Sequence, residues 1–392
     1  MGQIRVSQYC YVLVPTSSIS YCTRIPGRPT LTPITCPCSL YIFSTAKATF
    51  QSLYRSGYTP GLVELIATHA HHFAARIWIL DNSGSMAIGD GYRIVETSDQ
   101  RTEGQTVTRW QELTQMVIQQ AELASSLKLF TEFRFLNDPG PSAGAQTFVV
   151  GYGERVQQEV IHVRNLMLKS KPTGASPIQI PLRIVAERIR QIRHQLAITR
   201  RRVSLVIVTD GVPTDEDGSE TNHMAEDDFM DALRSLEGLP VWVVVRLCTS
   251  EKRVVDYWNN IDIDAGFGLQ LEVLDDHLSE AKEVARHNRW LNYALPLHRC
   301  REMGCQMRIV DLIDERKLTP HEMREFCLVL LGTKPESLPD PNKSLRTFSK
   351  ALEAELKNHR LQWDPVKKKM KPWIDIKALN QIYGKGLFRR LS

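Results

Sequence analysis

The chain lacks several features that would assign it to a common functional class. Among its 392 residues, no apolar run approaches the roughly 18 residues that a bilayer-spanning helix needs, so we predict no transmembrane segment. No G-x-x-x-x-G-K-[ST] stretch occurs, which excludes a P-loop nucleotide site. With 42% apolar and 24% charged residues, the composition is that of a soluble globular protein.

Cysteine spacing of the zinc type is also missing. Cys36 and Cys38 are separated by a single proline, and no second matching pair exists among the eight cysteines. A structural zinc site usually combines two pairs with wider spacing. We therefore interpret the cysteines as free or structural thiols, with a metal or disulfide role as the alternative.

Acidic residues are absent from the first 63 positions, which carry five basic residues. Residues 1–50 contain 13 Ser and Thr residues and show no sustained apolar period. This composition resembles that of organellar transit peptides, and it is equally compatible with a disordered tail or a misassigned start codon. We expect an intracellular, cytoplasmic protein in which residues 1–50 are a disordered or targeting segment.

Positive charge is concentrated at the two ends of the chain. Residues 362–392 carry eight basic residues and two acids. Subtracting this +6 and the +5 of residues 1–63 from the overall +5 leaves about −6 for the middle. A nucleic-acid-binding surface would have to lie at the ends, and we interpret residues 362–392 as a solvated basic tail whose Trp residues dock on the protein. We find no strong nucleic-acid signal.

Strand-like and helix-like segments alternate between residues 60 and 290. Residues 76–80 indicate a strand, and the apolar runs at 202–210 and 241–247 are typical of central parallel strands buried on both faces. Apolar residues spaced by four and three over 182–196 predict an amphipathic helix, and Ser176 and Pro177 suit its cap and first turn. This order predicts an α/β fold with a doubly wound, mostly parallel sheet.

The last hundred residues show helical patterns. Thr319, Pro320 and Glu322 have the spacing of a capping box with proline in the first turn, and Gly332 would end that helix. We divide the chain into a disordered or targeting segment (1–50), a short helical lead-in (51–73), an α/β domain (74–290), a helical extension (291–361) and a basic tail (362–392).

Two of the predicted strands end on aspartate. Asp81 is followed by Ser83 and Ser85, and Asp210 begins the turn after the second strand. Thr173 lies between them in the sequence, in a loop just before a helix. Because ligands of doubly wound sheets gather at the carboxyl ends of strands, we expect these five residues to lie together. Two carboxylates and three hydroxyls are hard oxygen donors and suit Mg²⁺, or Mn²⁺.

These residues resemble the metal-ion-dependent adhesion site of von Willebrand factor type A (vWA) domains. "DNSGSM" from residue 81 matches the Asp-x-Ser-x-Ser signature, and Thr173 and "TDG" at Asp210 match the other two parts of that site. The resemblance covers residues 74–290 and implies the Rossmann-like vWA fold.

In that family the serines and the threonine bind the ion directly or in alternation, and the carboxylates usually act through water. A Glu or Asp from a partner protein completes the coordination. The resemblance therefore implies a metal site formed by Asp81, Ser83, Ser85, Thr173 and Asp210. It also implies a non-enzymatic protein that binds a partner through this ion.

Two alternatives remain. One is a non-catalytic vWA subunit of a larger complex, of the chelatase or ubiquitin-receptor kind, which would share the binding chemistry. The other, less favoured, is a metal-dependent hydrolase. A phosphatase of the haloacid dehalogenase type would need a second Asp where Ser83 stands, and without it the nucleophile and general acid–base pair is incomplete.

The sequence departs from the family pattern after the first motif. Family members often enter the next helix quickly, whereas 22 residues, 86–107, intervene here. This insertion begins beside the expected ion, so it would form part of the partner surface or fold over the ion. Its acids are Asp90, Glu96, Asp99 and Glu103. Asp215, Glu216 and Asp217, after the second motif, are interpreted as solvated loop acids.

Overall fold

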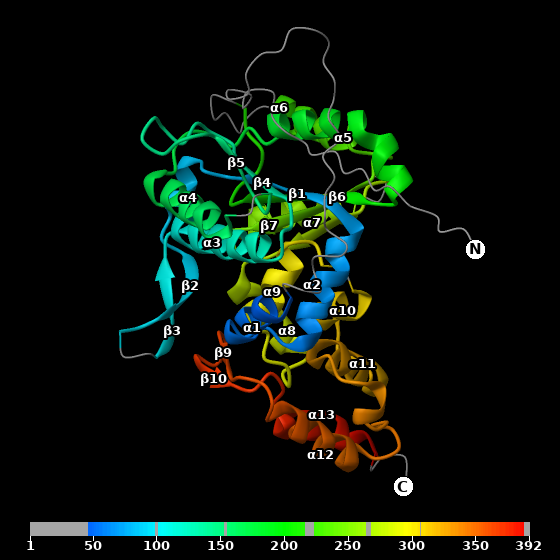
Figure 1. The fold of residues 1–392 in the computed structure, drawn as a ribbon. Coiled ribbons are helices and arrows are strands. Elements are labelled where there is room, and N and C mark those ends of the chain that lie inside the picture. Colours follow the sequence, from blue (N-terminus) through cyan, green and yellow to red (C-terminus); the bar gives the residue numbers. More distant parts are fainter. Residues whose placement is uncertain are drawn as a thin grey trace, which may run out of the picture.

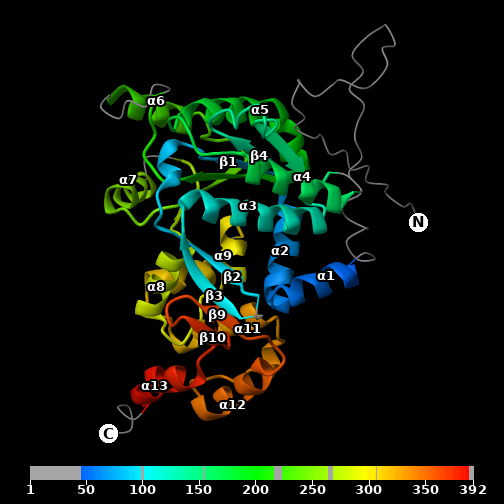
Figure 2. The same ribbon diagram turned by 90° about the vertical axis from the view of Figure 1, so that its left-hand side faces the viewer.

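The computed structural model describes residues 46–98, 101–152, 155–215, 223–263, 268–305 and 307–387. Residues 1–45, Asp99, Glu216 and Asp217 lie outside these ranges, so the expectations placed on them are not addressed. The described chain has a mixed α/β fold in which helices lie on both faces of a central sheet and a further helical layer lies below (Figures 1 and 2).

The central sheet has six strands in the order β5-β4-β1-β6-β7-β8. All neighbouring strands pair in parallel except β4 and β5, which are antiparallel. The strands are β1 (Phe73–Leu80), β4 (Thr131–Phe135), β5 (Thr147–Val150), β6 (Arg202–Thr209), β7 (Val241–Leu247) and β8 (Leu271–Leu274). The predicted α/β fold with a mostly parallel sheet is therefore confirmed.

The chain winds outward in opposite directions from the two central strands. After β1 it proceeds to β4 and β5 on one side, and after β6 it proceeds to β7 and β8 on the other. Such a reversal leaves a crevice at the carboxyl ends of the two adjacent strands, where open α/β sheets bind their ligands. Asp81 and Asp210 directly follow the two strands, β1 and β6, that form this switch point.

Side chains on the central strands alternate between two apolar cores, as the period of two in a strand requires. Ile77 and Ile79 pack with α5 (Gln179–Thr199), α6 (His223–Arg234) and α7 (Lys252–Ile263). Trp78 and Leu80 belong to the opposite core, which includes α3 (Arg109–Ser126) and α4 (Val156–Lys169). Both faces of the sheet are thus covered, which explains why its strands are continuously apolar.

Of two helix starts predicted from the sequence, the structure confirms one and contradicts the other. Helix α11 (Pro320–Leu331) has the predicted capping box of Thr319 and Glu322 and ends at Gly332, whose φ of 67° is left-handed. Helix α5 begins only at Gln179, with Ile178 as a cap that makes no side-chain bond. The prediction of Ser176 as its cap is wrong, because the Ser176 hydroxyl donates to Asp81 instead, at 3.1 Å.

Helices from both ends of the described chain form the layer below the sheet. Helix α2 packs against α9 and α11, although these follow it by more than 200 positions. The core that contains Trp78 continues without a break to Phe326 and Trp373. The helices of this layer are α1 (Ala46–Arg55), α2 (Pro60–His72), α8 (His277–His287), α9 (Leu295–Glu302), α10 (Arg308–Glu315), α11, α12 (Leu345–Leu356) and α13 (Ile376–Leu387). Of the helices in the described ranges, none has the length and apolar character to cross a membrane.

Two short hairpins lie beside this layer. A 3-10 turn, η2 (Gly84–Ala87), leads into the insertion, which contains an antiparallel hairpin of β2 (Gly91–Glu96) and β3 (Thr102–Val107). The hairpin runs away from the sheet toward a second one, β9 (Gln362–Asp364) and β10 (Lys369–Lys371), in the predicted basic tail (Figures 1 and 2). The strands of the insertion therefore do not fold over the expected ion.

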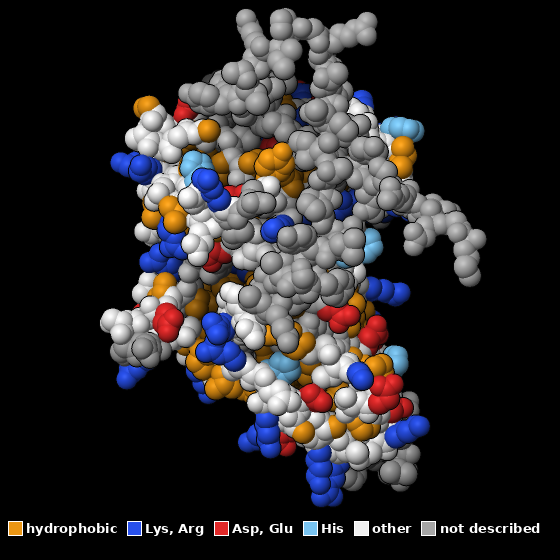
Figure 3. All heavy atoms as spheres, in the orientation of Figure 1, with side chains coloured by type: hydrophobic (Ala, Val, Ile, Leu, Met, Phe, Trp, Pro, Cys, Tyr) orange, Lys and Arg blue, Asp and Glu red, His pale blue; other side chains and the backbone are white. Residues whose placement is uncertain are grey.

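Lys and Arg side chains are spread over the visible face of the molecule, and several of them protrude at its lower end beside acidic ones (Figure 3). On α12 the exposed side chains include Arg346 and Lys350, and residues 366–370 of the β9–β10 turn are exposed. Trp373, in contrast, is only 1% exposed and belongs to the core. The predicted concentration of charge at the carboxyl end is thus a surface feature of a folded region.

Candidate metal site

The loop after β1 is held by the Asp81 carboxylate. Asp81 is fully buried, and its backbone N–H donates to the carbonyl of Val208 at 2.9 Å, which continues the pairing of β1 with β6. One carboxylate oxygen accepts the backbone N–H of Ser83 at 2.8 Å. The other accepts the hydroxyl of Thr209 at 2.7 Å. These bonds fix the turn that presents the two serines.

The serine hydroxyls link the two aspartates. Ser83 Oγ and Ser85 Oγ lie 3.0 Å apart, and Ser85 Oγ donates to a carboxylate oxygen of Asp210 at 2.8 Å. The structure thus links Asp81, Ser83, Ser85 and Asp210 by hydrogen bonds between the ends of β1 and β6, and the bond to Asp81 comes from the backbone N–H of Ser83. The sequence-based expectation that these four residues lie together agrees with this geometry.

Thr173 lies on a loop that is attached to the same turn. Its backbone N–H donates to the carbonyl of Asn82 at 2.7 Å, and the N–H of Gly84 donates to the carbonyl of Gly174 at 3.0 Å. Asn137 supports this loop by donating from its side chain to the carbonyl of Ala175 at 2.7 Å. The fifth predicted residue therefore lies on a loop that is bonded to the turn carrying Ser83 and Ser85, and its side chain is exposed.

The side chains of the site differ in their exposure to solvent, so that one side of the site is open to solvent and the other is closed. The carboxylates are buried, with Asp81 at 0% and Asp210 at 2% exposure. Ser85 and Thr173 are exposed. A ligand would therefore reach the hydroxyl side of the site from solvent, while the carboxylates remain behind it.

The site has an excess of negative charge that a cation would offset. Burial, together with the nearby Asp210 carboxylate, raises the pKa of Asp81 to about 6. Two buried carboxylates so close together are costly unless a positive charge is present. Their oxygens and the serine hydroxyls form an all-oxygen donor set, which fits Mg²⁺. Across the described ranges no three His, Cys, Asp or Glu side chains are placed to hold a metal, so this candidate depends on hydroxyl donors.

Three residues of the site were not predicted from the sequence. Thr209 and Ser176 both donate their hydroxyls to the same oxygen of Asp81. Arg109, the first residue of α3, donates to Asp210 at 2.9 Å and makes two bonds of 2.7 Å to Asp90 in the insertion. The sequence features that could have indicated two of them are the hydroxyl residue directly before Asp210, which is Thr209, and an arginine in the first turn of a helix, which is Arg109.

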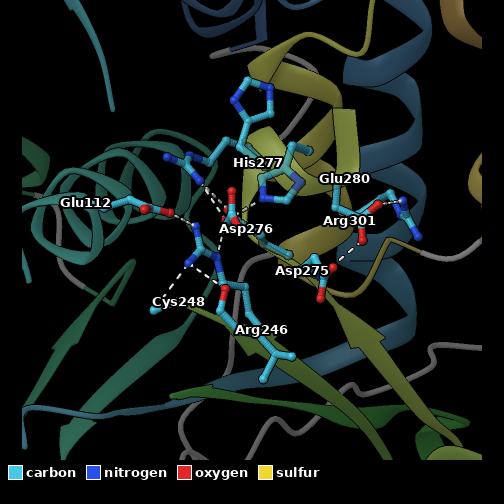
Figure 4. Close-up of polar contacts among 12 residues, drawn as sticks. Glu112, Arg246, Cys248, Asp275, Asp276, His277, Glu280 and Arg301 are labelled. Atoms are coloured by element: carbon cyan, nitrogen blue, oxygen red, sulfur yellow. Dashed lines mark hydrogen bonds and ion pairs between the residues drawn. The ribbon is translucent and has the colours of Figure 1, made fainter. Parts of the chain in front are cut away.

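A second group of charged residues, most of them buried, connects α3, β7 and the helices of the lower layer (Figure 4). Arg246 of β7 donates to Glu112 of α3, and it also donates to Glu302 of α9 at 3.2 Å. Arg301 donates to Glu280 and to Asp314, at 2.8 Å in each case. Arg246 and Glu302 are 0% exposed, whereas the Asp314 side chain is 14% exposed. We interpret it as a structural connection between the sheet and the lower helices.

Comparisons with known proteins do not assign the chain to a family. No family model matches this chain, and no curated protein matches it. Among solved structures, it matches a mutant of the PilB minor pilin from Streptococcus sanguinis with 12% sequence identity and a TM-score of 0.35. The match covers 51% of this chain and 56% of the pilin, so the chain spans about half the length of that structure. At this TM-score the likeness carries no inference about function.

Proposed function

We propose that this chain is a non-enzymatic vWA-type protein that binds Mg²⁺, or Mn²⁺, through Asp81, Ser83, Ser85, Thr173 and Asp210. The ion bridges to a Glu or Asp side chain of a protein partner. One observation carries this proposal: a run of hydrogen bonds at the switch point of the sheet joins Asp81 to the backbone N–H of Ser83, and the Ser83 and Ser85 hydroxyls to Asp210.

The distribution of donors favours ion-bridged binding. Hydroxyl ligands are neutral, so an ion held mainly by Ser83, Ser85 and Thr173 keeps most of its charge. The buried carboxylates would act through water and orient the hydroxyls. An ion in this state attracts an anionic group, and Mg²⁺ usually retains exchangeable waters that such a group can replace. Because the hydroxyl side is the open side, a partner carboxylate could approach there.

A non-catalytic subunit of a larger complex is the main alternative within the same chemistry. It would use the same ion and the same acidic contact, and it differs only in having a permanent partner. Co-purification distinguishes the two cases, because a permanent partner would remain bound in roughly equal amount through purification. A hydrolase is less favoured, since Ser83 stands where a second aspartate would be required.

The experiment that tests the proposal measures metal binding directly. Isothermal calorimetry with Mg²⁺ on EDTA-treated protein should show one site. Mg²⁺ should also raise the melting temperature, because a ligand that binds only the folded state stabilises it. Asp81→Ala should abolish both effects while circular dichroism remains that of the wild type.

Asp138→Ala is the matched control. Asp138 is an exposed carboxylate on the loop that follows β4, and it accepts the backbone N–H of Gly140. The control should bind Mg²⁺ like the wild type. The proposal is wrong if the wild type gives no heat of binding and no thermal shift with either Mg²⁺ or Mn²⁺.

A further inference from the structure

Arg109 occupies a position that elementary helix electrostatics disfavours. It is the first residue of α3, directly after the N-cap Thr108. The amino end of a helix carries partial positive charge, so cations are stabilising at the other end. Arg109 is also 4% exposed, and a buried guanidinium is costly unless it is fully paired. Some other interaction must therefore offset both costs.

Two carboxylates provide that interaction. Arg109 Nη1 donates to Asp210 at 2.9 Å, and Nε and Nη2 donate to the two oxygens of Asp90 at 2.7 Å each. The Asp210 side chain is 0% exposed, whereas that of Asp90 is 48% exposed. The guanidinium thus lies between a carboxylate of the candidate site and a carboxylate of the insertion.

The two oxygens of Asp210 have different partners. One accepts the hydroxyl of Ser85 and so faces the candidate ion site, while the other accepts Arg109. Arg109 therefore orients Asp210 and lowers the negative charge available to an ion. Asp90, in turn, neutralises Arg109. The affinity of the site for an ion therefore depends on the charges of Asp210, Arg109 and Asp90.

We propose that Arg109 is a built-in countercharge of the metal site, and that Asp90 in the insertion sets how strongly it opposes the ion. This inference rests on the proposed function for its metal-dependent part. In the metal-free protein Arg109 stabilises the buried Asp210 carboxylate. In the metal-bound protein it repels the ion, and pairing with Asp90 reduces that repulsion. The insertion thereby tunes metal affinity without supplying a ligand.

The test uses charge variants of the full chain in calorimetry with Mg²⁺ alone. Arg109→Gln removes the repelling charge and should tighten Mg²⁺ binding about tenfold, whereas Asp90→Asn leaves that charge uncompensated and should weaken binding by a similar factor. Arg109→Lys keeps the charge and should change affinity far less than Arg109→Gln. Arg93→Gln, which removes a charge from strand β2 of the same insertion, should leave affinity unchanged.

Melting temperatures in EDTA test the metal-free part separately. Arg109→Gln should lower the melting temperature in EDTA, and Arg109→Lys should lower it less, because only the former leaves the buried Asp210 carboxylate without its cation. Equal Mg²⁺ affinities in wild type, Arg109→Gln and Asp90→Asn would overturn the tuning role. If the wild type binds no Mg²⁺, the proposed function fails. The countercharge role would then be decided by the EDTA series alone, where equal melting temperatures would overturn it.

Discussion

The indole Nε1 of Trp363 donates a hydrogen bond of 2.8 Å to the hydroxyl of Tyr92. This bond joins the hairpin of the insertion to the β9–β10 hairpin, across 271 positions of the sequence. The main chain of Tyr92 is also anchored, because its N–H donates to Glu112 of α3 at 2.9 Å. The insertion is therefore fixed at its base by Arg109 and Asp90 and along its strands by α3 and the carboxyl-terminal hairpin.

Removing either partner of this contact should destabilise the protein modestly. Tyr92→Phe and Trp363→Phe each delete one side of a partly buried hydrogen bond, and each should lower the free energy of unfolding by about 1 kcal/mol. The double variant should cost less than the sum of the two, because the bond can be lost only once. Urea unfolding of the four proteins measures this coupling. Strict additivity would show that the two hairpins do not stabilise each other.

The main parts of the site were predictable because they follow from local rules. A buried apolar run that ends on an acid places that acid at the edge of a parallel sheet, and this rule located both Asp81 and Asp210. The short spacing from Asp81 to Ser85 kept the serines on the same turn. The paired apolar faces of the central strands likewise indicated helices on both sides of the sheet.

The remaining features depend on contacts between distant positions. Arg109 and Asp210 are 101 positions apart, and Ser176 and Asp81 are 95 apart. Nothing in the local pattern around Ser176 distinguishes a helix cap from a donor to a carboxylate. Strand β3 is largely polar, both strands are only partly buried, and the apolar alternation of β2 is limited to Tyr92 and Ile94, which is too short to predict a hairpin.

Thr209→Val should destabilise the metal-free protein more than an ordinary hydroxyl deletion. The Thr209 hydroxyl donates to the fully buried Asp81 carboxylate at 2.7 Å, and losing it leaves a charged acceptor short of one bond. The expected loss in unfolding free energy is about 2 kcal/mol. Ser204→Ala is the control on the same strand, since the Ser204 hydroxyl donates to the neutral carbonyl of Met303. Comparable losses in the two variants would mean that the charge of Asp81 does not matter here.

The buried network predicts a specific pH dependence through Asp275. Burial raises the pKa of Asp275 from an ordinary 3.8 to about 7, and the nearby acids Glu283 and Asp276 add to this shift. Between about pH 4 and pH 7 the folded state therefore keeps a proton that the unfolded state has lost, so this group makes stability fall as pH rises. Below pH 4 both states are protonated and the contribution is constant.

Asp275→Asn should remove this contribution, because an amide does not ionise. Relative to the wild type, the melting temperature of the variant should rise steadily from pH 4.5 to pH 8. Asp256→Asn, at an exposed carboxylate paired with Lys252, should show no such trend. A pH-independent difference between Asp275→Asn and the wild type would contradict the assignment of a proton to Asp275 in the folded protein.

Thr173 gives the most specific test of ion-bridged partner binding, because it changes no charge. If the Thr173 hydroxyl is a neutral ligand, Thr173→Ala should weaken Mg²⁺ binding at least about tenfold, the size of effect expected for loss of a single contact at a metal site. Thr173→Ser keeps the hydroxyl and should bind nearly as well as the wild type. Neither change should affect stability in EDTA, since the side chain is exposed.

A partner isolated in Mg²⁺ should bind Thr173→Ala weakly and Thr173→Ser normally, and EDTA should reduce wild-type binding to the level of Thr173→Ala. Replacing one Glu or Asp of that partner should have the same effect as EDTA. Equal partner affinity in Mg²⁺ and EDTA would move the interface away from the ion, to the insertion or the carboxyl-terminal helices, even if calorimetry still detects the metal.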